Sequence, residues 1–208
     1  MSFDADCRRC PRLADFLADV KAQYPHYHAA PVAPFGDPKA RLLIVGLAPG
    51  MHGANATGRP FTGDHAGILL YETLHKNGFS NRPQAVSLDD GLKLKDCRIT
   101  NAVKCLPPQN KPVGSEINTC NGFLCEELTG PSAPSLVIAL GSIAHQAVLK
   151  ALKLRQKDFP FAHAAEHRLG EGLQLLDSYH CSRYNTQTRR LTPKMFNQVF
   201  RRARRLLA

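Results

Sequence analysis

Short apolar runs alternate with amphipathic stretches along the chain, and this alternation predicts an α/β fold. Runs that fit buried strands of a parallel sheet cover residues 41–45, 97–103, 136–140 and 173–177. Stretches that fit helices cover residues 68–77, 115–128, 142–152 and 193–207, and a further helix follows Cys10. We therefore expect one domain over residues 1–208, a three-layer α/β/α sandwich around a central parallel sheet of about four strands.

A long glycine-rich loop, residues 46–67 (GLAPGMHGANATGRPFTGDHAG), directly follows the first predicted strand. Its six glycines and two prolines exclude a helix or strand interior. Loops of this length are usually functional or disordered, and the core-like segments on both sides favour an ordered, functional one. Ligands bind beyond the carboxyl ends of parallel strands, so we expect this loop to meet Asn101 and His180 there.

Three side chains near this predicted meeting point each allow two interpretations. Phe61, the only aromatic residue of the loop, is either a small core plug or a stacking platform. Asp64, the only carboxylate of the loop, is either the N-cap of the following helix or a functional acid. His180 is either a structural imidazole or part of a functional site.

The basic residues are concentrated at the end of the chain. The net charge is +10, and residues 178–208 contain eight Arg or Lys and no acid. This distribution favours a polyanion such as nucleic acid, the alternative being a solvated helix face. The first residues lack the apolar core of a signal peptide, and Pro and Gly interrupt the longest uncharged stretch. We therefore expect a cytoplasmic, monomeric protein without a membrane partner.

Seven cysteines make an odd count for a protein that we expect in the cytoplasm, which favours metal binding over disulfides. Cys7 and Cys10 form a C-x2-C pair at the start of a predicted helix, and Cys105 and Cys120 form a C-x14-C pair. Four thiolates can hold a [4Fe-4S] cluster or another metal. The alternative, buried cysteines without a ligand, fits Cys97 on its strand.

Residues 163–167 match the inverted zinc-protease signature H-x-x-E-H through His163, Glu166 and His167. That signature acts only on a helix, whereas Pro160 precedes this segment closely and Gly170 ends it. We therefore expect a loop or a single turn that packs against the sheet. A zinc peptidase is kept as a weaker alternative.

Six motifs, in the order in which they occur, resemble the iron-sulfur branch of the uracil-DNA glycosylase superfamily that is called family 5 or type b. The motifs are CRRC, PFGDPKARLLIVGLAPG, TGRPFTGDHAG, NAVKCLPPQNKP, EINTC and SYHCSRYNTQT. The resemblance implies a monofunctional glycosylase of base excision repair with an α/β fold. Such an enzyme flips uracil, or another deaminated base such as hypoxanthine or xanthine, out of duplex DNA and hydrolyses its N-glycosidic bond. A non-catalytic, metal-stabilised DNA-binding module is the alternative.

The resemblance also assigns roles to residues of this chain. Leu47 occupies the place where the related family-4 enzymes have an acid, so the catalytic carboxylate falls to Asp64, with His180 near O2 of the departing base. Gly46, Leu47, Ala48, Phe61 and Asn101 would contact the base. Cys7, Cys10, Cys105 and Cys120 would ligate a [4Fe-4S] cluster. After His180, Arg183 and Tyr184 would form the wedge that fills the gap in the duplex, and Arg189 and Arg190 would bind phosphates.

Overall fold

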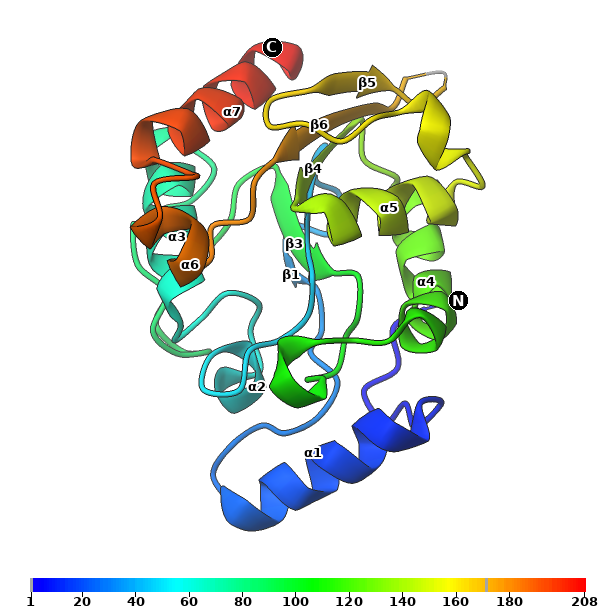
Figure 1. The fold of residues 1–208 in the computed structure, drawn as a ribbon. Helices are drawn as coiled ribbons and strands as arrows, with labels where there is room; N and C mark the ends of the chain where they lie inside the picture. Colours follow the sequence, from blue (N-terminus) through cyan, green and yellow to red (C-terminus); the bar gives the residue numbers. More distant parts are fainter. Residues whose placement is uncertain (1, 171) are drawn as a thin grey trace.

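A six-stranded sheet forms the centre of the molecule (Figure 1). The structure, a computed structural model, describes residues 2–170 and 172–208. The strand order is β1-β3-β2-β4-β6-β5. The strands are β1 (Phe35–Gly36), β2 (Leu42–Gly46), β3 (Cys97–Asn101), β4 (Leu136–Leu140), β5 (Glu166–Arg168) and β6 (Gln174–Ser178).

The four central strands run parallel and coincide with the four predicted strands, within two residues at each end. The sheet extends beyond the predicted central parallel sheet of about four strands. β1 and β5 pair antiparallel to the sheet edges and make it mixed. Both edge strands have only two or three residues, too few for an alternating pattern to reveal them.

Helices cover both faces of the sheet and confirm the three-layer α/β/α arrangement. In Figure 1, α3 and α7 lie on one face and α4 and α5 on the other. Leu42 and Ile44 pack with α3 and α7, whereas Leu43 and Val45 pack with α4 and α5, because successive strand residues point to opposite faces. The helices are α1 (Pro11–Gln23), α2 (Ala54–Thr57), α3 (His65–Lys76), α4 (Gly114–Thr129), α5 (Ser142–Ala151), α6 (Arg183–Gln187) and α7 (Pro193–Leu206).

Helix α7 lies within the helix predicted for residues 193–207. The Thr192 side chain accepts a hydrogen bond from the Met195 N–H and so caps the helix, and Pro193 occupies its first turn. Four of its apolar side chains are buried in the core. They are Phe196, Val199, Phe200 and Ala203. In the part of the chain that the structure describes, neither α7 nor any other helix is long and apolar enough to cross a membrane.

Two segments that leave the sheet differ from the predictions. The glycine-rich loop contains a four-residue helix, α2, and α3 begins at His65 rather than at residue 68. β3 ends at Asn101, two residues before the predicted end. The chain then runs beside the first residues of the loop, where the Ala102 N–H donates to the Gly46 carbonyl at 2.9 Å. This contact places the ends of β2 and β3 side by side.

Helix α1 lies beyond the carboxyl ends of the strands, outside the three layers (Figure 1). Leu13, Leu17 and Val20 are its buried residues and pack on α4 and on the segment that follows β3. The Arg12 Nε donates to Glu116 Oε1 of α4 at 2.7 Å. These contacts bring the N-terminal C-x2-C pair next to α4.

Candidate active site

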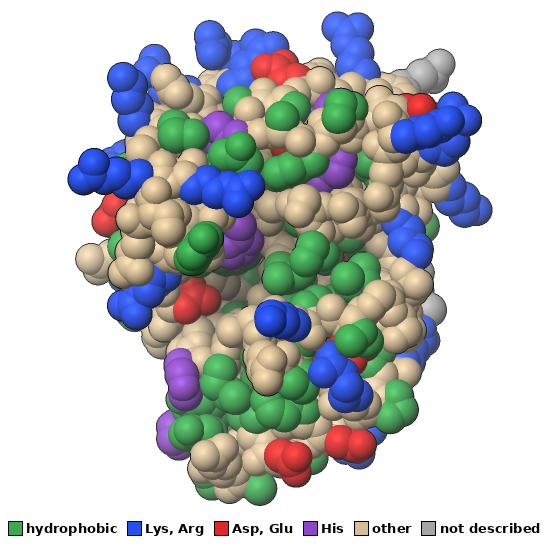
Figure 2. Space-filling view, viewed as in Figure 1, with side chains coloured by type: hydrophobic (Ala, Val, Ile, Leu, Met, Phe, Trp, Pro, Cys, Tyr) green, Lys and Arg blue, Asp and Glu red, His purple; other side chains and the backbone are tan. Residues whose placement is uncertain are grey.

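A pocket of about 610 Å³ opens at the carboxyl ends of β2, β3 and β6. Figure 2 shows this face of the molecule with a hollow near its centre and histidine and hydrophobic side chains around it. The strand ends thus form a site where ligands bind in open α/β sheets. The predicted site residues that line this pocket are Leu47, Ala48, Phe61, Asp64, Asn101, His180 and Arg183.

Gly46 makes room for two of these side chains. It lies opposite Asn101 in the parallel pairing of β2 and β3. A Cβ atom at Gly46 would lie 2.4 Å from Asn101 Oδ1 and 2.6 Å from Phe61 Cζ, closer than atoms can approach. Only glycine therefore lets the Asn101 amide and the Phe61 ring rest on the end of β2.

The Asn101 side chain is buried, and its Oδ1 has no hydrogen-bond partner among the described residues. A buried acceptor without a partner costs about 1–3 kcal/mol. A ligand that donates an N–H or O–H to Oδ1 removes this cost. The pocket therefore favours a ligand with a donor on the edge that faces Asn101.

Phe61 adopts a left-handed backbone conformation with φ of 54°, which is uncommon for an aromatic residue. Its carbonyl lies against Gly67, where a Cβ atom would come within 1.8 Å of the oxygen. The Tyr71 hydroxyl donates to the Pro60 carbonyl at 2.8 Å and fixes the preceding residue. The Phe61 ring lies 6.0 Å from the His180 ring with 31° between the planes. These contacts hold an aromatic ring in the pocket wall.

A buried ion pair that the sequence analysis did not single out fixes the loop just before Phe61. Arg59 Nη2 lies 2.5 Å from Asp90 Oδ2, and both side chains are buried. Arg59 Nε also donates to Thr62 Oγ1 at 2.9 Å, and its guanidinium stacks over the Phe35 ring. The Arg59 guanidinium holds the pKa of the Asp90 carboxyl well below its usual range. The pair stabilises the turn that presents Phe61.

Asp64 is an N-cap whose carboxylate also lines the pocket. Its Oδ1 accepts a hydrogen bond from the Gly67 N–H at 2.9 Å, which makes it the N-cap of α3. Its Oδ2 lies over Gly50 and Gly53, and a Cβ atom at Gly53 would lie 2.6 Å from this oxygen. Burial raises the pKa of the Asp64 carboxyl above its ordinary value. The cap is therefore confirmed, and the same carboxylate faces the pocket.

His180 follows β6 and is partly buried. The Asn185 Nδ2 donates to the His180 carbonyl at 2.8 Å and so fixes its backbone. Burial lowers the pKa of the His180 imidazole to about 4. The ring is therefore neutral at pH 7 and keeps one N–H that can donate into the pocket.

Helix α6, which is too short for a periodicity to reveal, carries two of the predicted DNA-binding residues at the pocket rim. Arg183 lines the pocket, and Tyr184 is 71% exposed. Arg189 is exposed with φ of 58°, and the Arg190 guanidinium lies 4.7 Å from the Tyr179 ring centroid. All four residues therefore lie on one segment next to His180.

His65 and Asn110 are among the pocket residues that the sequence analysis did not single out. His65 Nε2 lies 3.0 Å from Thr186 Oγ1 and links the start of α3 to α6 across the rim. Asn110 lines the pocket from the 3-10 turn Pro108–Asn110, with φ of 57°. Neither contact is visible in a local pattern, although the PPQN sequence at 107–110 signals a turn.

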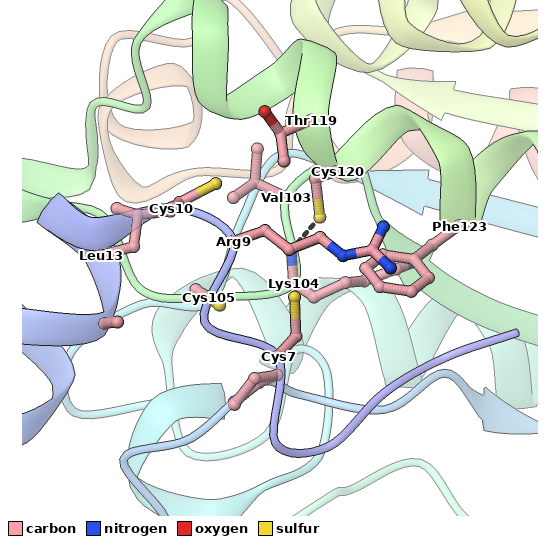
Figure 3. A pocket seen from close by; sticks show the side chains of 12 residues that line it. Cys7, Arg9, Cys10, Leu13, Val103, Lys104, Cys105, Thr119, Cys120 and Phe123 are labelled. Atoms are coloured by element: carbon pink, nitrogen blue, oxygen red, sulfur yellow. Dashed lines mark hydrogen bonds between the residues drawn. The ribbon is translucent and has the colours of Figure 1, made fainter. Parts of the chain in front are cut away.

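The four predicted metal ligands line a second pocket, between α1 and α4 (Figure 3). In Figure 3 the sulfur-bearing side chains surround one space, and Arg9 extends across it toward Phe123. The Lys104 N–H donates to the Cys120 Sγ at 3.3 Å. The prediction that the four cysteines come together is confirmed. They are Cys7, Cys10, Cys105 and Cys120, and the apolar walls are Leu13, Val103 and Phe123.

The donor set of this second pocket fits a metal or an iron-sulfur cluster. Burial raises the pKa of the Cys105 thiol to about 12, so its deprotonation needs a positive charge nearby. A bound metal supplies that charge and deprotonates a coordinating thiol outright. Four thiols, apolar walls and an N–H that points at sulfur form the surroundings that iron-sulfur clusters use. Cys97 is buried on its strand, outside this pocket, as the sequence predicts.

The H-x-x-E-H segment is not helical. Its last two residues begin the edge strand β5, where we expected a loop or a single turn. Glu166 pairs with Arg202 of α7, and His167 Nε2 lies 3.3 Å from Asp177 Oδ2. His163 accepts instead from the backbone N–H that follows β6. The helix that a zinc peptidase needs is absent from these described residues, so that alternative is wrong.

Comparison with known proteins identifies similar sequences over almost the whole chain. The family described as "Uracil DNA glycosylase superfamily" matches residues 33–204. The type-5 uracil-DNA glycosylase of Thermus thermophilus is 46% identical over 205 residues, which cover 96% of this chain and 93% of that protein. The type-5 uracil-DNA glycosylase of Pyrobaculum aerophilum is 42% identical over 202 residues, 95% of this chain and 88% of that protein. A type-4 uracil-DNA glycosylase of Archaeoglobus fulgidus is 32% identical over 149 residues, 71% of this chain and 61% of that protein.

Proposed function

Since the chain belongs to the uracil-DNA glycosylase superfamily and to its type-5 family, we propose that it is a monofunctional DNA glycosylase of base excision repair. It hydrolyses the N-glycosidic bond of uracil, and of deaminated purines such as hypoxanthine and xanthine, flipped out of duplex DNA. The observation that carries this proposal is the convergence of Phe61, Asp64, Asn101 and His180 on one pocket. A flipped base must be removed from the duplex before any side chain can reach its glycosidic bond.

Base recognition is assigned to Asn101 and Phe61. The unpaired Asn101 Oδ1 accepts the ring N–H that uracil, hypoxanthine and xanthine share, and this supports a broad base range. The Phe61 ring stacks on the base, and stacking tolerates pyrimidines and purines alike. Gly46, Leu47 and Ala48 shape the pocket floor through their backbone. The carbonyls of Gly46 and Leu47 already accept hydrogen bonds from the segment after β3, so they hold that floor in place.

Catalysis is assigned to Asp64 and His180. Cleavage passes through an oxocarbenium-like sugar, and the Asp64 carboxylate stabilises this cation and orients the water that captures it. Negative charge develops on the departing base, and the neutral His180 imidazole stabilises it with one N–H. The Leu47 side chain has no polar group that could orient water. Asp64 is the only carboxylate of the loop, and the role is therefore assigned to it.

The four cysteines hold a [4Fe-4S] cluster in this proposal. When bound, the cluster supplies structural cross-links between α1, the segment after β3, and α4. Hydrolysis of a glycosidic bond moves no electrons, so no redox step is assigned to these residues. The cysteines hold α1 in place, and the connection after α1 in turn supports the glycine-rich loop through the Ala29 N–H, which donates to the Asn55 carbonyl at 3.0 Å.

Duplex DNA lies across the rim that α6 forms. Arg183 and Tyr184 fill the gap that the flipped nucleotide leaves, which suits the strong exposure of Tyr184. Arg189 and Arg190 contact phosphates and set the register of the duplex. Binding should weaken steeply with salt, because each neutralised phosphate releases counterions.

A base-release assay tests the proposal directly. Duplexes with one uracil, hypoxanthine or xanthine are incubated with the protein and then treated with alkali, which cuts the strand at each abasic site. Strand cleavage at uracil, and at one or both purines, is expected, with no cleavage before alkali. Intact strands for all three bases, with DNA binding retained, would instead support the non-catalytic DNA-binding module.

A further inference from the structure

A third group of polar side chains lies outside both pockets, between α5, β5 and β6. His145, His167 and Asp177 each offer one atom to this group, and these atoms all lie within 4.8 Å of one another. The exposed fractions of the three side chains are 2%, 11% and 0%. The group contains His167 of the H-x-x-E-H segment but not His163. It lines neither the pocket at the strand ends that contains Asn101 and His180, called the base pocket below, nor the pocket of the four cysteines, called the cysteine pocket.

Both ring nitrogens of His145 face hydrogen-bond acceptors, which a neutral imidazole cannot satisfy with its single N–H. Its Nε2 lies 2.9 Å from the Phe159 carbonyl oxygen, and its Nδ1 lies 2.8 Å from Asp177 Oδ1. A carbonyl and a carboxylate only accept hydrogen bonds, whereas a neutral imidazole has a single N–H. With a single proton on the ring, either the Nδ1 lone pair faces the carboxylate or the Nε2 lone pair faces the carbonyl oxygen, so one of the two short contacts lacks a hydrogen. Such a contact is stable only with a second proton or with a cation between the two groups.

We propose that a divalent transition-metal ion of the zinc class binds between His145 Nδ1, His167 Nε2 and the Asp177 carboxylate. Two imidazoles and one carboxylate are ligands that zinc prefers. The bond from His145 Nε2 to the Phe159 carbonyl is the outer contact that orients metal-binding histidines.

Aromatic rings enclose this site. The Phe161 ring meets the His145 ring edge-on at 5.6 Å, and the Phe159 ring meets the His167 ring edge-on at 5.8 Å. An apolar enclosure of this kind lowers the local dielectric and strengthens the attraction between the ion and the carboxylate.

The ion would fasten the β5–β6 hairpin to α5. Backbone bonds already join this hairpin, since the Asp177 N–H donates to the Ala165 carbonyl at 2.9 Å. β6 continues directly into the segment that carries His180. The role of the ion is therefore structural, and it supports the strand from which the base pocket receives its histidine.

The test uses the purified protein with its iron retained and Zn²⁺ as the probe. After equilibration with zinc sulfate and gel filtration, elemental analysis should find about one zinc per chain in addition to iron. Zinc-edge X-ray absorption should show nitrogen and oxygen ligands at a distance of about 2.0–2.1 Å from zinc and no sulfur at about 2.3 Å. His167→Gln should lower the bound zinc at least tenfold. Glu166→Gln, which changes the neighbouring residue of the same strand, should leave it unchanged.

Three outcomes would overturn the proposal. They are wild-type protein without retained zinc, zinc with sulfur ligands, and equal zinc content in the His167→Gln protein. Iron content and the circular dichroism spectrum of His167→Gln identify a variant that failed to fold. His167 lies on a short edge strand and is the most exposed of the three ligands, which makes its substitution the mildest. The wild-type measurements alone decide the proposal if that variant does not fold.

Discussion

The base pocket and the cysteine pocket are both built from the segment that leaves β3, yet they depend on different properties of the chain. Asn101 ends β3 in the base pocket, and Cys105, four residues later, lines the cysteine pocket. The cysteine pocket is apolar and depends on four side chains of one type. The base pocket depends on backbone shape, because Gly46, Gly53 and the left-handed Phe61 bring its polar groups together. The cysteine pocket thus depends mainly on which side chains are present, and the base pocket on how the backbone places them.

The largest effect, on iron content, is expected when one of the four cysteine ligands is removed. Cys105→Ala should reduce iron from about four atoms per chain to near zero, because a cluster needs all its thiolates. The matched control is Cys125→Ala, which alters a cysteine of α4 outside the pocket and should retain iron. Elemental analysis and the absorbance at about 400 nm measure the iron content of both variants. Full iron in Cys105→Ala would contradict the ligand assignment.

The next largest effect is expected at Asp64, where two variants separate chemistry from helix capping. Asp64→Asn keeps a good N-cap but removes the charge, and base release should fall about 10²–10³-fold with DNA binding retained. Asp64→Ala should lose the same activity and about 1 kcal/mol of stability in addition. Single-turnover rates and urea unfolding measure the two effects. An active Asp64→Asn would leave Asp64 with the capping role alone.

A smaller effect on base release is expected when one methyl group is added to the backbone of the base pocket, as in Gly53→Ala. In Gly53→Ala the new Cβ would lie 2.6 Å from Asp64 Oδ2, so the carboxylate must move. We expect base release to fall about tenfold, since small misplacements of a catalytic group cost up to about 10²-fold. Gly114→Ala is the control, because nothing lies within 4 Å of its Cβ position. Equal rates of base release for Gly53→Ala and Gly114→Ala would show that a side chain at position 53 does not disturb the position of Asp64.

The smallest effect concerns pH. Burial raises the pKa of Asp64, so its carboxylate is lost on acidification earlier than that of an ordinary aspartate. His180, with a pKa lowered to about 4, stays neutral at pH values well above 4. Base release should therefore fall on the acid side, with an apparent pKa above that of a free aspartate. The pH profile of kcat/KM measures this limb, and a rate that rises on acidification would exclude Asp64 as the active carboxylate.

The features that could be predicted from the sequence are those that repeat over several consecutive residues. The four central strands and the long helices were visible because burial imposes a period on several consecutive residues, as in the apolar run of β2. The edge strands, α2 and α6 were missed because two to five residues show no period. The strand-end rule placed Asn101 and His180 together, and cysteine spacing identified the second pocket.

Other parts of the site could not be predicted because they arise from tertiary contacts. The pairing of Arg59 with Asp90 joins residues 31 positions apart, and Asp90 lies in a segment without a motif. The left-handed backbone of Phe61 follows from its packing against Gly67, not from any preference of phenylalanine. His145 and Asp177 likewise meet only when α5 and β6 pack together.

The N-cap geometry of Asp64 has an evolutionary consequence. At most active sites the residue that chemistry requires weakens the fold, so selection for stability and selection for activity oppose each other. At position 64 the helix accepts Asp, Asn and Ser about equally as a cap, and Thr somewhat less well. A library at this position that is screened only for folding should return all four residues, and only a screen for base release should single out aspartate. Drift to an inactive but well-folded protein is therefore a single substitution away.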